Sequence, residues 1–170
     1  MLARDVAGGS GVAGGDGSEE LAVLPVGQRP PEPVPAELAV IGHIGIDVPD
    51  LVAAKRYYDA LVPALGFEPY FDDDQIAYRP AGGRPGTYLF VNRSSAETAY
   101  RDDATGLQHL AFMVKSRSAV LQALALAESL GSEILIAPRE FPQYPPPYFA
   151  GFWRDPHGFK LEAVCHYDRE

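Results

Sequence analysis

Two histidines and one glutamate in this 170-residue sequence form a set of side chains that can bind a divalent metal ion. Two neutral imidazoles and one carboxylate, with positions left open for water or substrate, suit iron, manganese, nickel, cobalt or zinc. His43 and His109 are 66 residues apart, and Glu162 follows 53 residues later. Because this spacing is no local motif, the three residues make a site only if the fold brings them together.

A near-repeat in the chain gives a reason to expect such a fold. Each histidine lies in a predicted strand that a predicted amphipathic helix follows. The strands are expected at 40–48 and 107–114, and the helices at 49–61 and 116–129. Gly66 and Gly131, which are expected to end the helices, follow the respective histidines after 23 and 22 residues. The matching spacing indicates that one strand–helix–strand unit is used twice.

Further strand signals extend both units. In the first unit, one predicted strand begins at Gly66 and two more cover 75–79 and 87–92. In the second unit, one begins at Glu133 and two more cover 148–154 and 159–164. The predicted fold class is therefore α+β, with two tandem βαβββ modules that pair around a metal-containing cavity. A single domain is expected over 38–170, with module one at about 39–93 and module two at about 106–166.

Strand alternation predicts which residues face that cavity. Ile44, Ile46 and Val48 are expected under the first helix, and Leu110, Phe112 and Val114 under the second. The opposite faces carry His43 and Gly45, then His109, Ala111 and Met113, and Glu162 on the last strand. If the two open faces meet, they enclose all three candidate ligands. Each candidate also has an ordinary alternative, since strand histidines are often only hydrogen-bonded and Glu162 has Lys160 or Arg154 as a salt-bridge candidate.

The first 37 residues differ from the rest in composition. They hold seven Gly, five Pro, and six acidic against two basic residues. Such a segment buries too little apolar surface to offset the entropy of ordering, so a disordered or loosely docked leader is expected.

Charge and composition exclude several classes of protein. A net charge of −9 argues against binding to nucleic acid or to an anionic membrane surface. The single cysteine excludes a disulfide framework. No run is long enough to span a membrane, and no secretory signal is evident, so a cytoplasmic protein is expected.

Three motifs resemble those of the vicinal oxygen chelate superfamily, also called the glyoxalase/bleomycin resistance/dioxygenase family. They are GHIGIDVPDL at 42–51, QHLAFMV at 108–114 and DPHGFKLEAV at 155–164, and the resemblance covers about 39–166. It implies paired βαβββ modules around a metal, with a histidine ligand on the first strand of each module and a glutamate ligand on the last. His43, His109 and Glu162 match those positions.

One departure from the family pattern concerns the first module. Glyoxalase-I-like members carry a second carboxylate on its last strand, where alignment of Gly86 with Gly158 puts Phe90. The resemblance therefore implies a three-ligand site and a protein that is not a glyoxalase I in the strict sense. Phe90, Met113 and Tyr148 are expected to line a substrate pocket for small aromatic or apolar oxygen-bearing molecules, and Tyr148 is the one candidate for a catalytic side chain.

Two classes of function follow from this resemblance. The first is a metal-dependent enzyme with lyase, isomerase or dioxygenase chemistry on a small molecule. The second is a non-catalytic protein that sequesters a small molecule, as bleomycin-resistance relatives do. Relatives also exchange modules between subunits, so the modules pair either within one chain or between chains, and a homodimer is predicted.

Overall fold

The computed structural model describes residues 41–96 and 98–168, and the predicted leader at 1–37 lies outside them. The first module consists of β1 (His43–Val48), α1 (Leu51–Leu61), a 3₁₀ turn (Val62–Leu65), β2 (Phe67–Asp72), β3 (Gln75–Pro80), a second 3₁₀ turn (Ala81–Gly83) and β4 (Tyr88–Arg93). The second consists of β5 (Leu110–Met113), α2 (Arg117–Ser129), β6 (Glu133–Glu140), β7 (Phe149–Arg154) and β8 (Lys160–Cys165).

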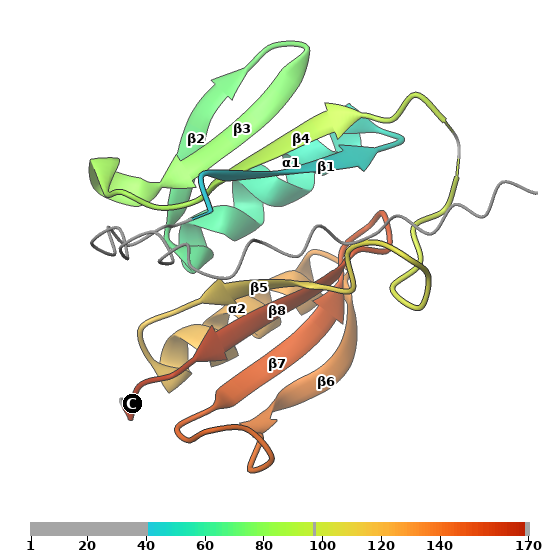
Figure 1. Cartoon of the computed structure of the whole chain (residues 1–170). Helices are drawn as coiled ribbons and strands as arrows, with labels where there is room; N and C mark the ends of the chain where they lie inside the picture. Colours follow the sequence, from blue (N-terminus) through green and yellow to red (C-terminus); the bar gives the residue numbers. More distant parts are fainter. Residues whose placement is uncertain (1–40, 97, 169–170) are drawn as a thin grey trace, which may run out of the picture. The chain divides into compact units, whose positions relative to one another are not determined.

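Each module is a mixed four-stranded sheet with one helix along one face (Figure 1). The strand orders are β1-β4-β3-β2 and β5-β8-β7-β6, which are the same order in the two modules. The first strand of each module runs parallel to the last, and the other neighbours are antiparallel. The predicted α+β fold of tandem βαβββ modules is thus confirmed.

Both helices begin with a side-chain cap. Asp50 Oδ1 accepts a hydrogen bond from the Ala53 N–H at 2.9 Å, and Ser116 Oγ accepts one from Ala119 N–H at 3.1 Å. The first helix begins at Leu51 and not at residue 49, because Asp50 takes the extended N-cap conformation.

The first helix ends at Leu61, as predicted, but Gly66 does not end it directly. A 3₁₀ turn continues the chain to Gly66, whose φ of 83° ends that turn. Pro63 explains the change, because proline has no N–H to donate to the carbonyl one helical turn earlier. Gly131, with φ of 88°, ends the second helix region as predicted.

The two helices and the helix-facing strand residues form one apolar core that spans both modules. Polar contacts inside it join the modules. The Tyr58 hydroxyl donates to Asp155 Oδ2 at 2.7 Å, and Trp153 Nε1 donates to the Tyr57 hydroxyl at 2.9 Å. Burial raises the pKa of Tyr57 to about 12, so its hydroxyl stays protonated at neutral pH. Trp153 is fully buried in this core.

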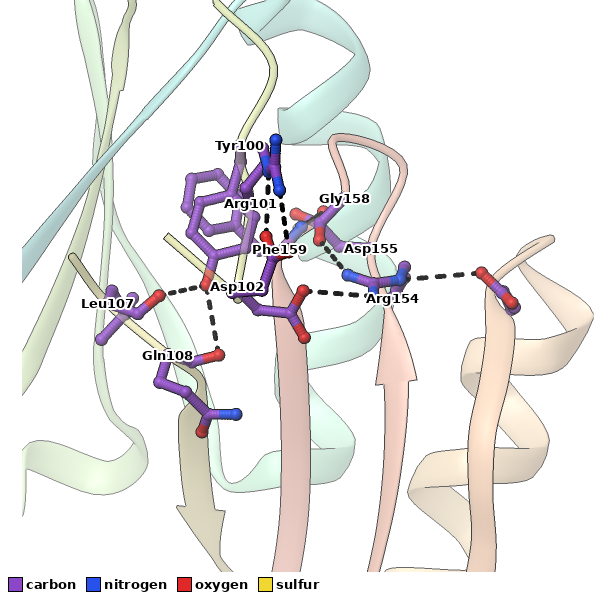
Figure 2. A network of polar contacts seen from close by, with 11 residues as sticks. Tyr100, Arg101, Asp102, Leu107, Gln108, Arg154, Asp155, Gly158 and Phe159 are labelled. Carbon is purple, nitrogen blue, oxygen red and sulfur yellow. Dashed lines mark hydrogen bonds and ion pairs between the residues drawn. The ribbon is translucent and has the colours of Figure 1, made fainter. Parts of the chain in front are cut away.

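The segment between the modules is fastened to module two by the contacts in Figure 2. The Tyr100 hydroxyl donates to the carbonyls of Leu107 and Gln108, and its ring lies 4.3 Å from that of Phe159. The predicted strand at 107–114 was consequently too long, because β5 begins only at Leu110.

None of the helices in residues 41–96 and 98–168 is long and apolar enough to cross a membrane.

Candidate metal centre

Two of the three predicted ligands meet in module two. His109, directly before β5, places its Nε2 3.1 Å from Oε2 of Glu162 on β8. The Glu162 side chain is almost completely buried, and its other oxygen, Oε1, accepts a hydrogen bond from the Tyr148 hydroxyl at 2.8 Å. The carboxylate is thus held at Oε1 and directed at the imidazole through Oε2.

The other ring nitrogen of His109, Nδ1, contacts Gln108 Oε1. Glu162 Oε2 is buried and accepts no hydrogen bond from the described residues. An imidazole nitrogen and a carboxylate oxygen are donors that divalent metal ions bind in proteins, and these two atoms lie 3.1 Å apart. This donor pair therefore fits a divalent metal ion.

Glu162 is buried because the open face of the second sheet carries its own apolar cluster. Phe141, Ala150, Phe152 and Val164 form that cluster, with Tyr148 packed against it. The Tyr148 ring lies 5.7 Å from that of Phe141, and the His109 ring lies 5.9 Å from that of Phe152. Burial, and then the hydrogen bond to Glu162, raise the pKa of Tyr148, so its hydroxyl is a donor to the carboxylate at neutral pH.

The third predicted ligand lies in module one. His43 lines an open hollow of about 380 Å³ on the face of the first sheet opposite α1, together with Gly45, Gln75, Phe90 and Asn92. The His43 imidazole meets the Phe90 ring edge to face, with the ring centres 5.4 Å apart. No side chain of module two lines this hollow.

Strand register shows that Phe90 and Glu162 are equivalent. Gly45, two residues after His43, is the ladder partner of Phe90. Ala111, two residues after His109, is the ladder partner of Glu162. The sequence alignment of the two modules predicted this equivalence, and the phenyl ring stands where the second module has its carboxylate.

Within residues 41–96 and 98–168, no three His, Cys, Asp or Glu side chains lie close enough together to hold a metal ion. The structure brings His109, Glu162 and Tyr148 together, and it places His43 and Phe90 in a separate hollow. Met113, predicted to line the pocket, is 62% exposed at the end of β5. His109 with Glu162 therefore forms one half-site, and His43 forms the other. A site with all three predicted ligands would need these two half-sites to meet through a different pairing of modules.

Several residues around these half-sites were missed from the sequence. Gln108, whose Oε1 contacts His109 Nδ1, precedes the histidine directly, but neighbours in sequence give no sign of a side-chain contact. Gln75 and Asn92 lie on the same sheet face as His43, and alternation along β4 from Phe90 could have found Asn92.

Comparisons with known proteins agree with this fold. No protein-family model matches the sequence, and no curated protein matches it. Among solved structures, a candidate glyoxalase from Bacillus halodurans is 27% identical with a TM-score of 0.64; the match covers 75% of this chain and 96% of that one. A glyoxalase/bleomycin resistance protein from Albidiferax ferrireducens is 21% identical with a TM-score of 0.61, over 75% and 98% of the two chains. A fosfomycin resistance protein from Listeria monocytogenes is 16% identical with a TM-score of 0.55, over 77% and 96%.

These matches and the strand order show that the chain is an α+β protein of tandem βαβββ modules. The resemblance predicted from its motifs is confirmed: the chain has the fold of the glyoxalase/bleomycin resistance/dioxygenase family, the vicinal oxygen chelate superfamily.

Proposed function

We propose that this protein is a metal-dependent enzyme that acts on an oxygen-bearing small molecule, with His43, His109 and Glu162 as the ligands of one divalent metal ion. The observation that carries the proposal is the buried Glu162 Oε2, which faces His109 Nε2 at 3.1 Å and accepts no hydrogen bond from the described residues. A buried carboxylate oxygen without a donor is costly unless a cation compensates it.

The proposal includes a homodimer in which the two half-sites face each other across subunits. His43 is an exposed residue on an open sheet face, and the ligands that would complete its site belong to module two. Exposed aromatic side chains flank the same face, namely Tyr70 at 47% and Phe71 at 42% exposure. A second copy that covers this face would bury those rings and bring His109 and Glu162 to His43.

When bound, the metal would act as a Lewis acid toward two oxygens of the substrate, which suits lyase, isomerase or dioxygenase chemistry. The chain's own residues have separate roles. The Tyr148 hydroxyl holds Glu162 Oε1 and leaves Oε2 as the ligand atom. Gln108 Oε1 contacts His109 Nδ1, and an N–H on that nitrogen would leave Nε2 to bind the metal. Phe90 gives the opposite wall an apolar surface next to His43.

Phe90 also bears on which reaction takes place. Strict glyoxalase I chemistry needs a base within reach of a carbon-bound proton, and Phe90 occupies the position that the family pattern gives to the second carboxylate. We expect little turnover of the methylglyoxal–glutathione hemithioacetal with nickel, zinc, manganese or iron supplied in turn. A kcat/KM of about 10⁴ M⁻¹s⁻¹ or more, the lower end of the usual range for enzymes, would contradict this expectation.

A second candidate is a binding protein that sequesters a small aromatic compound without metal. The observation that favours it is the run of aromatic rings on the open face of the first sheet, where Tyr88 lies 5.3 Å from Tyr70 and 6.5 Å from Phe90. Such rings offer stacking surface to a planar ligand whether or not a metal is bound.

Metal content separates the two candidates. The full chain, purified without added metal and then reconstituted, is analysed by elemental mass spectrometry beside a His109→Ala variant. The proposal predicts close to one transition metal ion per chain in the wild type and a large loss in the variant, with the melting temperature kept because Leu110 and Phe112 still pack in the core. Absence of metal from the wild type after reconstitution favours the binding protein.

A further inference from the structure

Two amide side chains line the hollow beside His43. Gln75 on β3 and Asn92 on β4 are direct ladder partners, and Gln75 Nε2 donates a hydrogen bond to Asn92 Oδ1. Both side chains are half-buried. No lysine or arginine lines the hollow with them.

This hydrogen bond uses only part of what the two amides offer. A primary amide has two N–H donors and one oxygen with two lone pairs. The bond leaves Gln75 Oε1 and Asn92 Nδ2 without a hydrogen-bond partner among the described residues. The pair therefore presents an acceptor and a donor beside each other, which is complementary to a ligand group that donates and accepts at neighbouring atoms.

The pair lies at the far end of the hollow from the predicted metal ligand. His43 is the ladder partner of Tyr88, and Asn92 lies four residues further along the same strand, about 13 Å away at roughly 3.3 Å per residue. Phe90 stands between them on the same face. Its partner Gly45 has no side chain to block the hollow, and a Cβ there would lie 3.8 Å from Asn92 Nδ2.

Charge indicates which kind of group would bind. Asp47 is the partner of Asn92 on β1, so the same row of the sheet ends in an exposed carboxylate. An anionic ligand group would be repelled there and would find no cation among the lining residues. A neutral carboxamide or lactam meets the amide pair without that repulsion.

We propose that Gln75 and Asn92 are specificity-determining residues that select a substrate with a flat apolar body over Phe90 and a carboxamide or lactam at the end remote from the metal-binding oxygens. This inference rests on the proposed function, since it adds the substrate class to the same site. A volume of about 380 Å³ suits a ligand of one or two rings.

Three probes that differ at one position test it: 3,4-dihydroxybenzamide, 4-methylcatechol and 3,4-dihydroxybenzoate. All three carry the same vicinal oxygens, and isothermal titration into the metal-loaded full chain measures their affinities. We expect the amide to bind about tenfold more tightly than the methyl compound, because two hydrogen bonds are gained in a partly desolvated hollow, and the benzoate to bind more weakly than the amide.

Variants then assign the preference to the pair. Asn92→Leu, of similar size, should remove the preference for the amide over 4-methylcatechol. Asn92→Asp keeps the shape of the side chain but not its donor, and it serves if the leucine variant does not fold. Gln122→Leu, on the exposed side of α2, is the matched control and should change neither affinity.

The outcomes separate this inference from the proposed function. If the three probes bind the wild type with equal affinity, or if Asn92→Leu keeps the tenfold preference, the amide pair does not select the substrate, and the metal site stands. If none of the probes binds the metal-loaded chain, the substrate class inferred here is overturned and the metal site stands. If no metal is bound, the proposed function is overturned and this inference with it.

Discussion

The two modules share one backbone plan and differ in what they place at equivalent positions. After His109, the ladder pair is Ala111 with Glu162, and the carboxylate is buried under a tyrosine hydroxyl. After His43, the ladder pair is Gly45 with Phe90, and the phenyl ring borders an open hollow. The repeated unit thus keeps a histidine in both copies, while one copy provides the charged ligand and the other provides shape and apolar surface.

The modules also differ in how their last two strands are joined. In module one, β3 and β4 are linked through a 3₁₀ turn and a Pro- and Gly-containing stretch. In module two, Asp155–Gly158 form a tight turn in which Gly158 N–H donates to the Asp155 carbonyl at 3.0 Å. The Asp155 carboxylate accepts from Tyr58 of module one and from the N–H groups of His157 and Phe159. The second module therefore carries a buried acid at the contact between the two.

The largest expected effect comes from substituting Glu162, compared with a substitution of its equivalent Phe90. Glu162→Gln should lower metal affinity by more than about 100-fold, because loss of residues that only support a ligand already costs roughly 10–100-fold. Phe90→Leu, the matched change in module one, should leave metal affinity within about threefold. Competition with a fluorescent chelator measures both. Equal losses in the two variants would show that the modules do not differ as described.

Removal of the buried contact between modules should have the next largest effect, on stability. Tyr58→Phe leaves Asp155 without its hydroxyl donor in a fully buried position, which should reduce the free energy of unfolding by about 1–3 kcal/mol. Chemical denaturation measures the change. Tyr70→Phe, on the exposed face, is the control, and an effect no larger than that of the control would mean that the contact contributes nothing.

A smaller effect is expected from the residue that supports Glu162. Tyr148→Phe keeps the packing against Phe141 but removes the donor to Oε1, and it should weaken metal binding by about tenfold. Tyr144→Phe keeps the neighbouring ring and should have no effect on metal binding. If the metal affinity of Tyr148→Phe is unchanged, the Tyr148 hydroxyl does not position the Glu162 carboxylate.

The smallest effect concerns pH. Burial raises the pKa of the Asp155 carboxyl above its usual value near 3.8, although the hydrogen bonds it accepts oppose that rise. Between that value and the raised one, the native state holds more protons than the unfolded state, so stability falls as pH rises through this window and is flat above it. Urea unfolding at several pH values should show this slope. The slope should be absent in Asp155→Asn and present in Asp73→Asn; a slope that persists in Asp155→Asn would be inconsistent with this assignment.

Most of the fold was predictable because it depends on periodic patterns that the chain uses twice. Alternation placed His43, His109 and Glu162 on the faces away from the helices, and the repeat identified Phe90 as the equivalent of Glu162. Element ends were less predictable, since they depend on single contacts such as the Asp50 cap and the Tyr100 hydroxyl at the start of β5.

The site was predictable only in part, for a physical reason. Patterns within one strand show on which face of the sheet a side chain lies. They carry no information about which residues of other segments pack against it. The burial of Glu162 depends on Phe141, Phe152 and Tyr148, which come from separate segments. The amide pair of Gln75 and Asn92 likewise depends on the register between two strands. Both required three-dimensional structure.

Mixing two defective chains tests most directly whether the unlike half-sites of two copies combine. His43→Ala and Glu162→Gln chains, co-expressed with two different non-histidine tags, are isolated as the mixed dimer, and metal is measured per dimer. One half-site pair in that dimer keeps His43, His109 and Glu162, while the other lacks both changed residues. The account predicts about one metal ion per mixed dimer and almost none in either variant alone. A mixed dimer that holds as little metal as its parents would contradict it.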